Sequence, residues 1–276
     1  MDSKIGVVYF SKNRPLQLDL AISSNKLCCK DWDSIAHYVI YTADEPYKKA
    51  YNTLISEHPD CEFIKETVFK DNLLSIVKKI DYIVFSVDDV IYTTDYFISN
   101  VAETLYNTKE AIGFSLRLGY NTTFSFAQNK EHITPDFSIV GKSGEVDILK
   151  YNWITEVYNA DFGFPLEVSG TLYRARDLLF IMSNTKWDNP NTLELALYSN
   201  VQGYFYLPEM LCFEKSTCFS APLNKVYLDN NNNRTGDKEE YSVENLLSKY
   251  EDGFRIKSDK FYNFLPTSPH QEISLF

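Results

Sequence analysis

Two adjacent carboxylates, Asp88 and Asp89, directly follow an apolar run and are the side chains best suited to binding a charged ligand. Residues 82–87 are predicted to form a buried strand, because β-branched and aromatic residues dominate them. In an open α/β sheet, ligands bind beyond the carboxyl ends of the strands. Two carboxylates there repel each other unless a cation lies between them, and a divalent metal that also binds phosphate oxygens is the usual cation. The pair therefore predicts a metal-bridged diphosphate site; the alternative is a solvated acidic turn.

The elements around this pair alternate between strands and helices. Strands are predicted at residues 4–10, 35–41, 62–64, 82–87 and 111–118, and helices at residues 16–27, 46–56, 72–79 and 96–106. Alternation in units of this size predicts a three-layer α/β fold with a largely parallel sheet. In such a sheet, the carboxyl ends of the strands at residues 4–10 and 82–87 would lie at the same edge.

The pattern changes after residue 118. Residues 121–158 are polar and aromatic without a clear period, and are predicted to form a hairpin or an extended excursion. Further strands are predicted at residues 166–173 and 204–208, and further helices at residues 175–183, 192–199 and 243–250. No internal repeat or linker is present, so a single domain is expected over residues 1–276, with a C-terminal extension from residue 220.

Composition and charge exclude several classes of partner. The chain has 276 residues, 44% of them hydrophobic, and a formal net charge of −11 with dispersed lysines and arginines. This charge argues against nucleic acid and against an anionic membrane surface as the main partner. No apolar run is long enough to span a bilayer and no signal peptide is found, so a cytoplasmic location is expected. The five cysteines lack metal-type spacing and are expected to be reduced core thiols.

Four stretches, taken in order, carry a resemblance to a known family. They are Phe10-Ser-Lys-Asn-Arg-Pro-Leu-Gln-Leu18, Ser86-Val-Asp-Asp-Val90, Phe114-Ser-Leu-Arg-Leu-Gly119 and Asn189-Pro-Asn-Thr-Leu-Glu194. From residue 4 to about residue 210 the chain resembles the nucleotide-sugar-dependent glycosyltransferases of the GT-A fold, close to family-2-like bacterial and viral members. The resemblance implies a three-layer, Rossmann-like α/β fold with a mostly parallel sheet, helices on both faces and a C-terminal extension.

The same resemblance implies an enzyme that transfers a sugar from a nucleotide-diphosphate-sugar donor to a glycan or glycoconjugate acceptor. Residues 1–118 would form the nucleotide-binding half, residues 119–219 the acceptor and catalytic half, and residues 220–276 an extension over the active site. UDP is the first expectation for the donor nucleotide, with GDP or dTDP as alternatives.

Donor contacts are implied for several residues. They are Phe10, Ser11, Arg14, Thr42, Asp71, Asn72, Asp88, Asn224 and Lys225. Arg14 would approach a phosphate or stack on the base; alternatively it is solvated beside Pro15, which opens the first helix. Asp71 or Asn72 would touch the base or only cap a helix.

The metal ligands implied by the resemblance are Asp89, Asp88 and His270, with manganese or magnesium as the ion. Val87 occupies a position where the family pattern often carries an acidic residue, so the motif only partly matches. A metal ion would neutralise charge on the leaving diphosphate. For His270, a solvated histidine near the chain end is the alternative.

Glu194 is the candidate catalytic base. It is expected in the first turn of a helix capped by Asn191 or Thr192, where it would remove the proton of the acceptor hydroxyl, with inversion favoured. The alternative is a first-turn glutamate favoured by the helix dipole. Asp161 and Glu167 are the reserve bases.

Arg117 lies between apolar neighbours and is expected to pair with an acidic residue or to face the donor. Two other classes compete with a glycosyltransferase. A sugar nucleotidyltransferase would carry a glycine-rich phosphate loop, and residues 11–15 contain no glycine. A catalytically inactive sugar- or protein-binding relative would keep the fold and lose metal affinity. An enzyme is the prediction.

Overall fold

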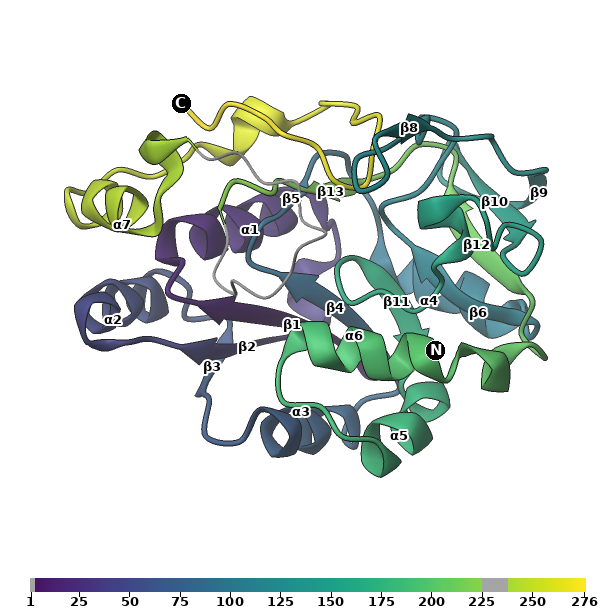
Figure 1. Cartoon of the computed structure of the whole chain (residues 1–276), viewed down its shortest axis with the longest axis horizontal. Helices are drawn as coiled ribbons and strands as arrows, with labels where there is room; N and C mark the ends of the chain where they lie inside the picture. The colour runs from purple at the N-terminus through teal and green to yellow at the C-terminus, as the bar shows by residue number, and fades with distance from the viewer. Residues whose placement is uncertain (1–2, 225–237) are drawn as a thin grey trace.

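The computed structural model describes residues 3–224 and 238–276. Its centre is a nine-stranded sheet with the order β3-β2-β1-β4-β11-β6-β12-β10-β9 (Figure 1). The first half of the chain contributes β1 (Ile5–Lys12), β2 (Ala36–Thr42), β3 (Glu62–Lys65) and β4 (Tyr82–Val87), all parallel to one another. β1 and β4 are continuous apolar runs because the sheet is covered on both faces.

The second half of the chain extends the same sheet. It contributes β6 (Ala111–Ser115), β9 (Ser138–Ser143), β10 (Val146–Asn152), β11 (Thr171–Arg174) and β12 (Glu209–Phe213). β11 lies antiparallel between β4 and β6, whereas β12 is parallel to β6. β10 and β9 form an antiparallel hairpin at the edge, with β10 also antiparallel to β12. Only β10 and β11 therefore run against the other strands of this sheet, and the predicted mostly parallel sheet is confirmed.

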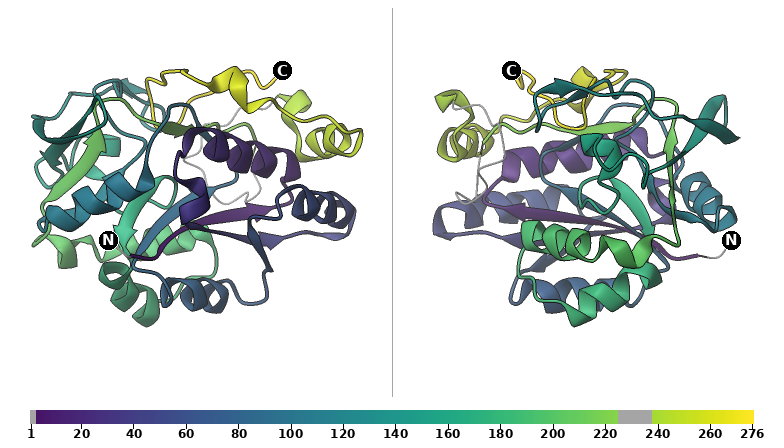
Figure 2. Two further views of the ribbon diagram at one scale, coloured as in Figure 1. Left: turned by 180° about the vertical axis from the view of Figure 1, so that it is seen from behind. Right: turned by 45° about the vertical axis from the view of Figure 1, so that its right-hand side comes forward.

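Helices cover both faces of the sheet and bury two separate apolar cores. α1 (Pro15–Cys28), α2 (Lys48–Glu57), α4 (Ile98–Asn107) and α7 (Val243–Glu251) contribute to one core. α3 (Phe69–Val77), α5 (Ala175–Asn184) and α6 (Pro190–Ser199) contribute to the other. Figures 1 and 2 show the two helical layers with the sheet between them, so the predicted three-layer architecture is confirmed. No helix in the described parts of the chain combines the length and the apolar character needed to cross a bilayer.

Two small sheets and the C-terminal segment close one side of the molecule. β5 (Val90–Tyr92) pairs with β13 (Cys218–Ser220), and β7 (Phe124–Ser125) pairs with β8 (Lys130–Glu131). The C-terminal segment runs alongside, where the backbone N–H of Ser220 donates to Pro269 at 2.8 Å and that of Thr123 donates to Thr267 at 2.9 Å. Residues far apart in the sequence therefore meet above the carboxyl ends of the central strands.

Three predicted elements differ from those observed. The strand predicted at residues 166–173 begins only at Thr171. The residue before it, Gly170, has a φ of +121°, which is not a strand conformation, and the segment that leads to it is irregular. No strand forms at residues 204–208, where one was predicted. Residues 201–204 form a 3-10 turn, and the strand is β12, which begins after Pro208, a residue with no N–H to donate to a ladder. The strand predicted at residues 111–118 ends at Ser115.

All five cysteines are free and buried, as the sequence predicted. Burial raises the pKa of the Cys28, Cys29 and Cys61 thiols to about 12 in each case. Burial also raises the pKa of Cys212 and Cys218. These thiols are therefore protonated side chains of the core at neutral pH.

Candidate active site

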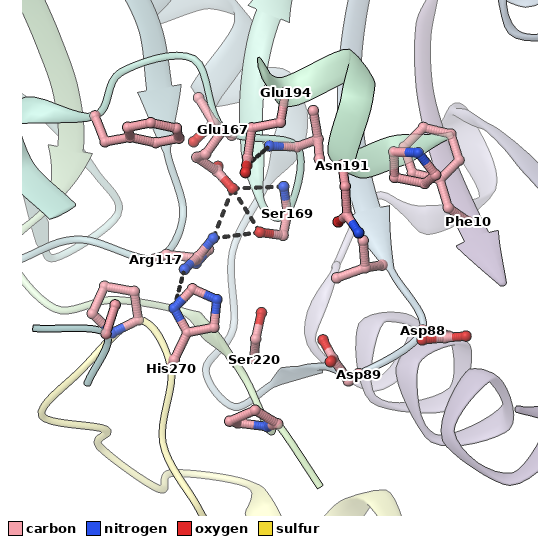
Figure 3. A pocket seen from close by; sticks show the side chains of 18 of the residues that line it. Phe10, Asp88, Asp89, Arg117, Glu167, Ser169, Asn191, Glu194, Ser220 and His270 are labelled. Carbon is pink, nitrogen blue, oxygen red and sulfur yellow. Dashed lines mark hydrogen bonds and ion pairs between the residues drawn. The ribbon is translucent and has the colours of Figure 1, made fainter. Parts of the chain in front are cut away.

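A cavity of about 700 Å³ lies at the carboxyl ends of β1 and β4, between α6 and the C-terminal segment (Figure 3). This is the edge of the sheet at which α/β proteins bind ligands. Most site residues predicted from the sequence line this cavity: Phe10, Ser11, Arg14, Asp88, Asp89, Asp161, Glu167, Glu194, Asn224 and His270. The sheet therefore collects side chains from the whole length of the chain in one place.

Three residues predicted to bind the nucleotide do not line the cavity. The Thr42 hydroxyl donates to Glu66 at 3.2 Å, and the Asn72 carbonyl oxygen accepts the backbone N–H of Thr67 at 3.0 Å. Asp71 is exposed in the first turn of α3. The structure places Thr42, Asp71 and Asn72 outside the cavity, contrary to the prediction, because local hydrogen bonds or solvent occupy their side chains. Lys225 lies outside the described residues.

Asp88 is held by the loop that follows β1. One carboxylate oxygen accepts from Arg14 Nη1 at 3.0 Å, and the other accepts from Ser11 Oγ at 2.9 Å. Its side chain is only 6% exposed. Asp88 is therefore a buried, paired carboxylate, and each of its oxygens keeps one lone pair free for the predicted metal ion.

Asp89 is less fully paired than its neighbour. Arg14 Nη1 lies 3.8 Å from Asp89 Oδ2, while Asp89 Oδ1 is buried and has no hydrogen-bond partner among the described residues. Burial, with the adjacent charge of Asp88, raises the pKa of Asp89 to about 6 despite the opposing charge of Arg14. The Arg14 guanidinium is thus a cation that lies beside both carboxylates.

Arg14 is fixed by further contacts. Its Nη2 donates to the Asn224 carbonyl oxygen at 2.5 Å, and its backbone N–H donates to the Tyr51 hydroxyl at 3.2 Å. The Tyr51 hydroxyl is also hydrogen-bonded to Ser11 at 2.6 Å. Arg14 is therefore not solvated, and it links the acidic pair to residue 224.

Arg117 crosses the opposite side of the cavity. Its Nη1 donates to Glu167 at 2.7 Å and also to the Ser169 hydroxyl. The same Glu167 oxygen accepts the backbone N–H of Ser169 at 2.5 Å and its hydroxyl at 2.8 Å. The predicted pairing of Arg117 with an acidic residue is confirmed. Because one Glu167 oxygen carries three hydrogen bonds, Glu167 is better suited to a fixed counter-charge than to its predicted role as a reserve base.

His270 is placed by Arg117 rather than by the acidic pair. Arg117 Nη2 lies 3.3 Å from His270 Nδ1, and a guanidinium can only donate, so Nδ1 accepts and the proton of the neutral ring is on Nε2. Burial lowers the pKa of His270 to about 3, with the charge of Arg117 as the next cause. His270 therefore presents an N–H rather than a lone pair at Nε2, and in this tautomer it does not fit its predicted role as a metal ligand.

Asp161 is paired with a residue that the sequence analysis did not single out. His132 Nε2 is 2.8 Å from Asp161 Oδ2, and His132 Nδ1 is 3.0 Å from Asn159 Oδ1. The Asn159 amide nitrogen already donates to Ile133 and Glu156, so its oxygen faces His132 as an acceptor. His132 is thus held between Asp161 and Asn159 through both of its ring nitrogens.

Burial acts to raise the pKa of Asp161, but the hydrogen bond from His132 and the charge of Arg117 outweigh it and leave the pKa below its usual value. An ionised, hydrogen-bonded carboxylate with a lowered pKa is a weak proton acceptor. Asp161 is therefore less suited to the role of base than the sequence allowed. His132 is a single histidine in the polar segment of residues 121–158, so no sequence pattern pointed to it.

Glu194 is the cavity carboxylate whose environment suits proton transfer near neutral pH. Asn189 caps α6 in a capping box with Thr192, so Glu194 lies in the second turn of the helix, whereas the prediction put it in the first. Its Oε1 accepts the backbone N–H of Val168 at 3.2 Å. Burial and, after it, the nearby charge of Glu167 together raise the pKa of Glu194 to about 7. A base is most effective when its pKa lies near the working pH.

The net charge of the cavity affects whether a metal ion can bind there. Among its described lining residues, negative side chains outnumber positive ones by three: Glu66, Asp88, Asp89, Asp161, Glu167 and Glu194 against Lys12, Arg14 and Arg117. No group of three or more His, Cys, Asp or Glu residues in the described ranges is arranged to hold a metal ion alone. The unpartnered Asp89 Oδ1 fits an ion that also takes oxygen ligands from a diphosphate. A diphosphate would itself need added positive charge here.

Comparison with known proteins gives one curated relative with detectable sequence similarity. The bifunctional glycosyltransferase pgtA of Dictyostelium discoideum is 28% identical over 189 residues, which cover 64% of this chain and 25% of the relative. The predicted resemblance to glycosyltransferases is confirmed. The chain spans about a quarter of the length of this relative. No protein-family model matches.

Solved structures of low sequence identity overlap part of the fold. Staphylococcus aureus TarS 1–349 in complex with UDP-GlcNAc is 9% identical with a TM-score of 0.49, over 80% of this chain and 59% of that one. The mannosyltransferase PcManGT from Pyrobaculum calidifontis, solved with GDP-Man and Mn²⁺, is 11% identical with a TM-score of 0.34, over 45% and 41%. A cytidylyltransferase from Leptospira borgpetersenii is 13% identical with a TM-score of 0.41, over 72% and 71%. All three scores describe partial overlap.

Proposed function

We propose that this chain transfers a sugar from a nucleoside-diphosphate-sugar donor to a hydroxyl of a glycan or glycoconjugate acceptor. One observation carries the proposal: a carboxylate with a pKa raised to about 7, Glu194, shares one cavity with the acidic pair at the end of β4. The sequence similarity to a glycosyltransferase supports the same reaction class.

The donor side of the cavity is formed by the loop after β1 and the end of β4. Phe10 and Ser11 would contact the nucleoside, and Arg14 and Asn224 the diphosphate. A divalent ion bound with the donor would be held by Asp89 and would neutralise charge on the leaving diphosphate. UDP is the first candidate nucleotide, and GDP and dTDP are the alternatives.

The chemistry at the other side is a proton abstraction coupled to displacement. Glu194 accepts the proton of the acceptor hydroxyl while that oxygen forms a bond to the anomeric carbon of the donor sugar. The bond between the anomeric carbon and the diphosphate oxygen breaks, and the nucleoside diphosphate leaves with the electron pair. A single displacement of this kind inverts the configuration at the anomeric carbon. Glu167 stays paired with Arg117, and Asp161 stays hydrogen-bonded to His132, during the step.

A nucleotidyltransferase is the less favoured alternative. Residues 11–15 form the loop between β1 and α1 and contain no glycine, whereas a triphosphate-binding loop of that class uses glycine to let backbone N–H groups approach the phosphates.

A thermal-shift panel of UDP, GDP and dTDP, each with and without Mn²⁺, tests the donor site. A ligand that binds only the folded state raises the melting temperature by mass action, so one nucleotide should give a shift that requires the metal ion. Asp89→Asn should remove the metal-dependent part of the shift. Asp71→Asn, a carboxylate change outside the cavity, should leave it unchanged. No shift with any nucleotide would favour an inactive sugar-binding relative instead.

A further inference from the structure

We propose that Arg14 is a built-in counter-ion of the acidic pair, and that it must leave Asp89 before a divalent ion can bind there. The consequence is that the ion and the diphosphate bind together rather than one after the other. This inference rests on the proposed function, because the diphosphate is what draws Arg14 away.

The contacts place one cation beside two carboxylates. Arg14 Nη1 lies 3.0 Å from Asp88 Oδ1 and 3.8 Å from Asp89 Oδ2. The side chains are 11%, 6% and 19% exposed for Arg14, Asp88 and Asp89. Water therefore screens these charges weakly, and their mutual attraction and repulsion are strong.

A divalent ion and the guanidinium would compete for the same carboxylate. An ion held by Asp89 would lie within a few ångströms of Arg14 Nη1 and would be repelled by it. The ion alone offers Arg14 no replacement acceptor. A metal ion without nucleotide is therefore expected to bind weakly, although Asp89 Oδ1 has no hydrogen-bond partner.

A diphosphate removes both obstacles. Its oxygens accept hydrogen bonds from a guanidinium in a paired, planar geometry that suits arginine. The same diphosphate supplies oxygen ligands that a divalent ion needs beyond one carboxylate. Arg14 can then exchange Asp89 for phosphate while the ion takes Asp89.

The exchange requires movement of a side chain only. The Arg14 backbone N–H is held by Tyr51, and Asp88 keeps its hydrogen bond from Ser11 when Arg14 departs. For the guanidinium to turn, Nη1 must leave Asp88 Oδ1 at 3.0 Å and Nη2 must leave the Asn224 carbonyl oxygen at 2.5 Å, whereas Nε has no partner among the described residues. The loop after β1 can therefore stay in place while the guanidinium turns.

Electron paramagnetic resonance of free Mn²⁺ measures the affinity of the ion without any turnover. The wild-type chain should bind Mn²⁺ at least tenfold more tightly with the nucleoside diphosphate than without it. Arg14→Gln should raise the affinity for Mn²⁺ alone at least tenfold, and Arg14→Lys should give a smaller rise because it keeps the positive charge. Arg176→Gln removes the same charge from an exposed site and should behave like wild type.

The possible results separate the inference from the proposed function. If wild-type protein binds Mn²⁺ equally well with and without nucleotide, or if Arg14→Gln leaves the affinity for Mn²⁺ alone unchanged, the inference is overturned and the donor site stands. If no nucleotide binds any variant, the proposed function fails, while a gain of Mn²⁺ affinity in Arg14→Gln would still support the counter-ion role. Should Arg14→Gln not fold, the wild-type comparison and Arg14→Lys decide.

Discussion

Carboxylates of one cavity differ in their chemistry because they differ in their partners. Asp88 accepts hydrogen bonds from Arg14 and a serine hydroxyl. One Glu167 oxygen accepts three hydrogen bonds from Arg117 and Ser169, while its other oxygen is buried with no partner among the described residues. Asp89 and Glu194 have fewer partners, and burial raises the pKa of Asp89 to about 6 and that of Glu194 to about 7. A carboxylate that accepts hydrogen bonds from a cation stays ionised, whereas a buried carboxylate with few hydrogen bonds is prepared to bind a cation or a proton.

Replacing the proposed base separates binding from chemistry. Glu194→Gln should leave nucleotide-dependent thermal stabilisation intact and should lower the transfer rate by about 10²–10⁴-fold, the range typical of general base removal. Transfer is measured as release of nucleoside diphosphate from the donor in the presence of acceptor. The exposed Glu110→Gln serves as the control. Turnover at the wild-type rate in Glu194→Gln would move the base to Asp161 or Glu167.

The transfer rate should follow the protonation of Glu194. The base acts when it is deprotonated, and its pKa is raised to about 7, so kcat should fall as pH decreases below about 7 and level off above it. Glu167→Gln removes a like charge, which stabilises the Glu194 anion, and should therefore move this acid limb to lower pH. A pH–rate profile with its acid limb near the ordinary glutamate value would contradict the assignment.

At the scale of elements, one glycine joins β11, β4 and β6 at the cavity. The Gly170 N–H donates to Phe85 at 2.8 Å and its carbonyl oxygen accepts from Leu116 at 2.8 Å. Its φ is +121°, and a Cβ there would lie 2.9 Å from Arg117 Cγ and Cδ. Because Gly170 has no Cβ, the Arg117 side chain can pass close to its backbone and reach Glu167.

Gly170→Ala should lower the free energy of unfolding by roughly 1–3 kcal/mol, because both the backbone conformation and the Arg117 side chain are strained. Urea denaturation measures the change. Gly144 also has a positive φ, of +61°, but nothing lies within 4 Å of the position that an alanine methyl would take there. Gly144→Ala thus isolates the backbone cost, and should be less harmful than Gly170→Ala. Equal losses in both variants would show that the Arg117 contact is unimportant.

The elements also mark where sequence reasoning succeeded and where it failed. The strand at residues 82–87 was predicted with its observed bounds, because β-branched and aromatic residues dominate these positions and favour a buried strand. The cap of α6 was misplaced by two or three residues, although Asn189 followed by Pro190 is a signal for a helix start. The strand β12 was predicted too early, because its register depends on β6 and β10 rather than on local sequence.

The predicted residues of the site gathered as expected, but their pairing did not. The contact between Arg14 and Asp88 joins residues 74 positions apart, and that between Arg117 and His270 joins residues 153 positions apart. No local pattern contains either contact. The sequence therefore identified carboxylates that could bind a cation. It did not show that the Arg14 guanidinium already lies beside them.

At the scale of the whole molecule, the C-terminal segment completes the cavity wall. Pro266 and Thr267 accept hydrogen bonds from Asn121 and Thr123, and Pro269 accepts from Ser220. Leu275, close to the end of the segment, is only 2% exposed. This segment therefore belongs to the folded body and not to a loose tail.

Deletion of residues 266–276 should lower the melting temperature and abolish nucleotide-dependent stabilisation, because a wall of the cavity is lost. Far-UV circular dichroism should remain close to that of the full chain, since the nine-stranded sheet lies outside the deleted residues. His270→Ala in the full chain, which removes only the ring, is the milder comparison and should keep more of the stabilisation. An unchanged nucleotide shift after the deletion would exclude the segment from the site.

The burial of the five cysteines has a practical consequence for labelling. Maleimides react with thiolates, and thiols with a pKa of about 12 or more supply almost none at neutral pH. A cysteine introduced at Tyr158, which is 90% exposed, would thus react far faster than the native thiols. The natural sequence can then carry a fluorophore or spin label at a chosen position without prior removal of any cysteine, which makes distance measurements across the cavity feasible.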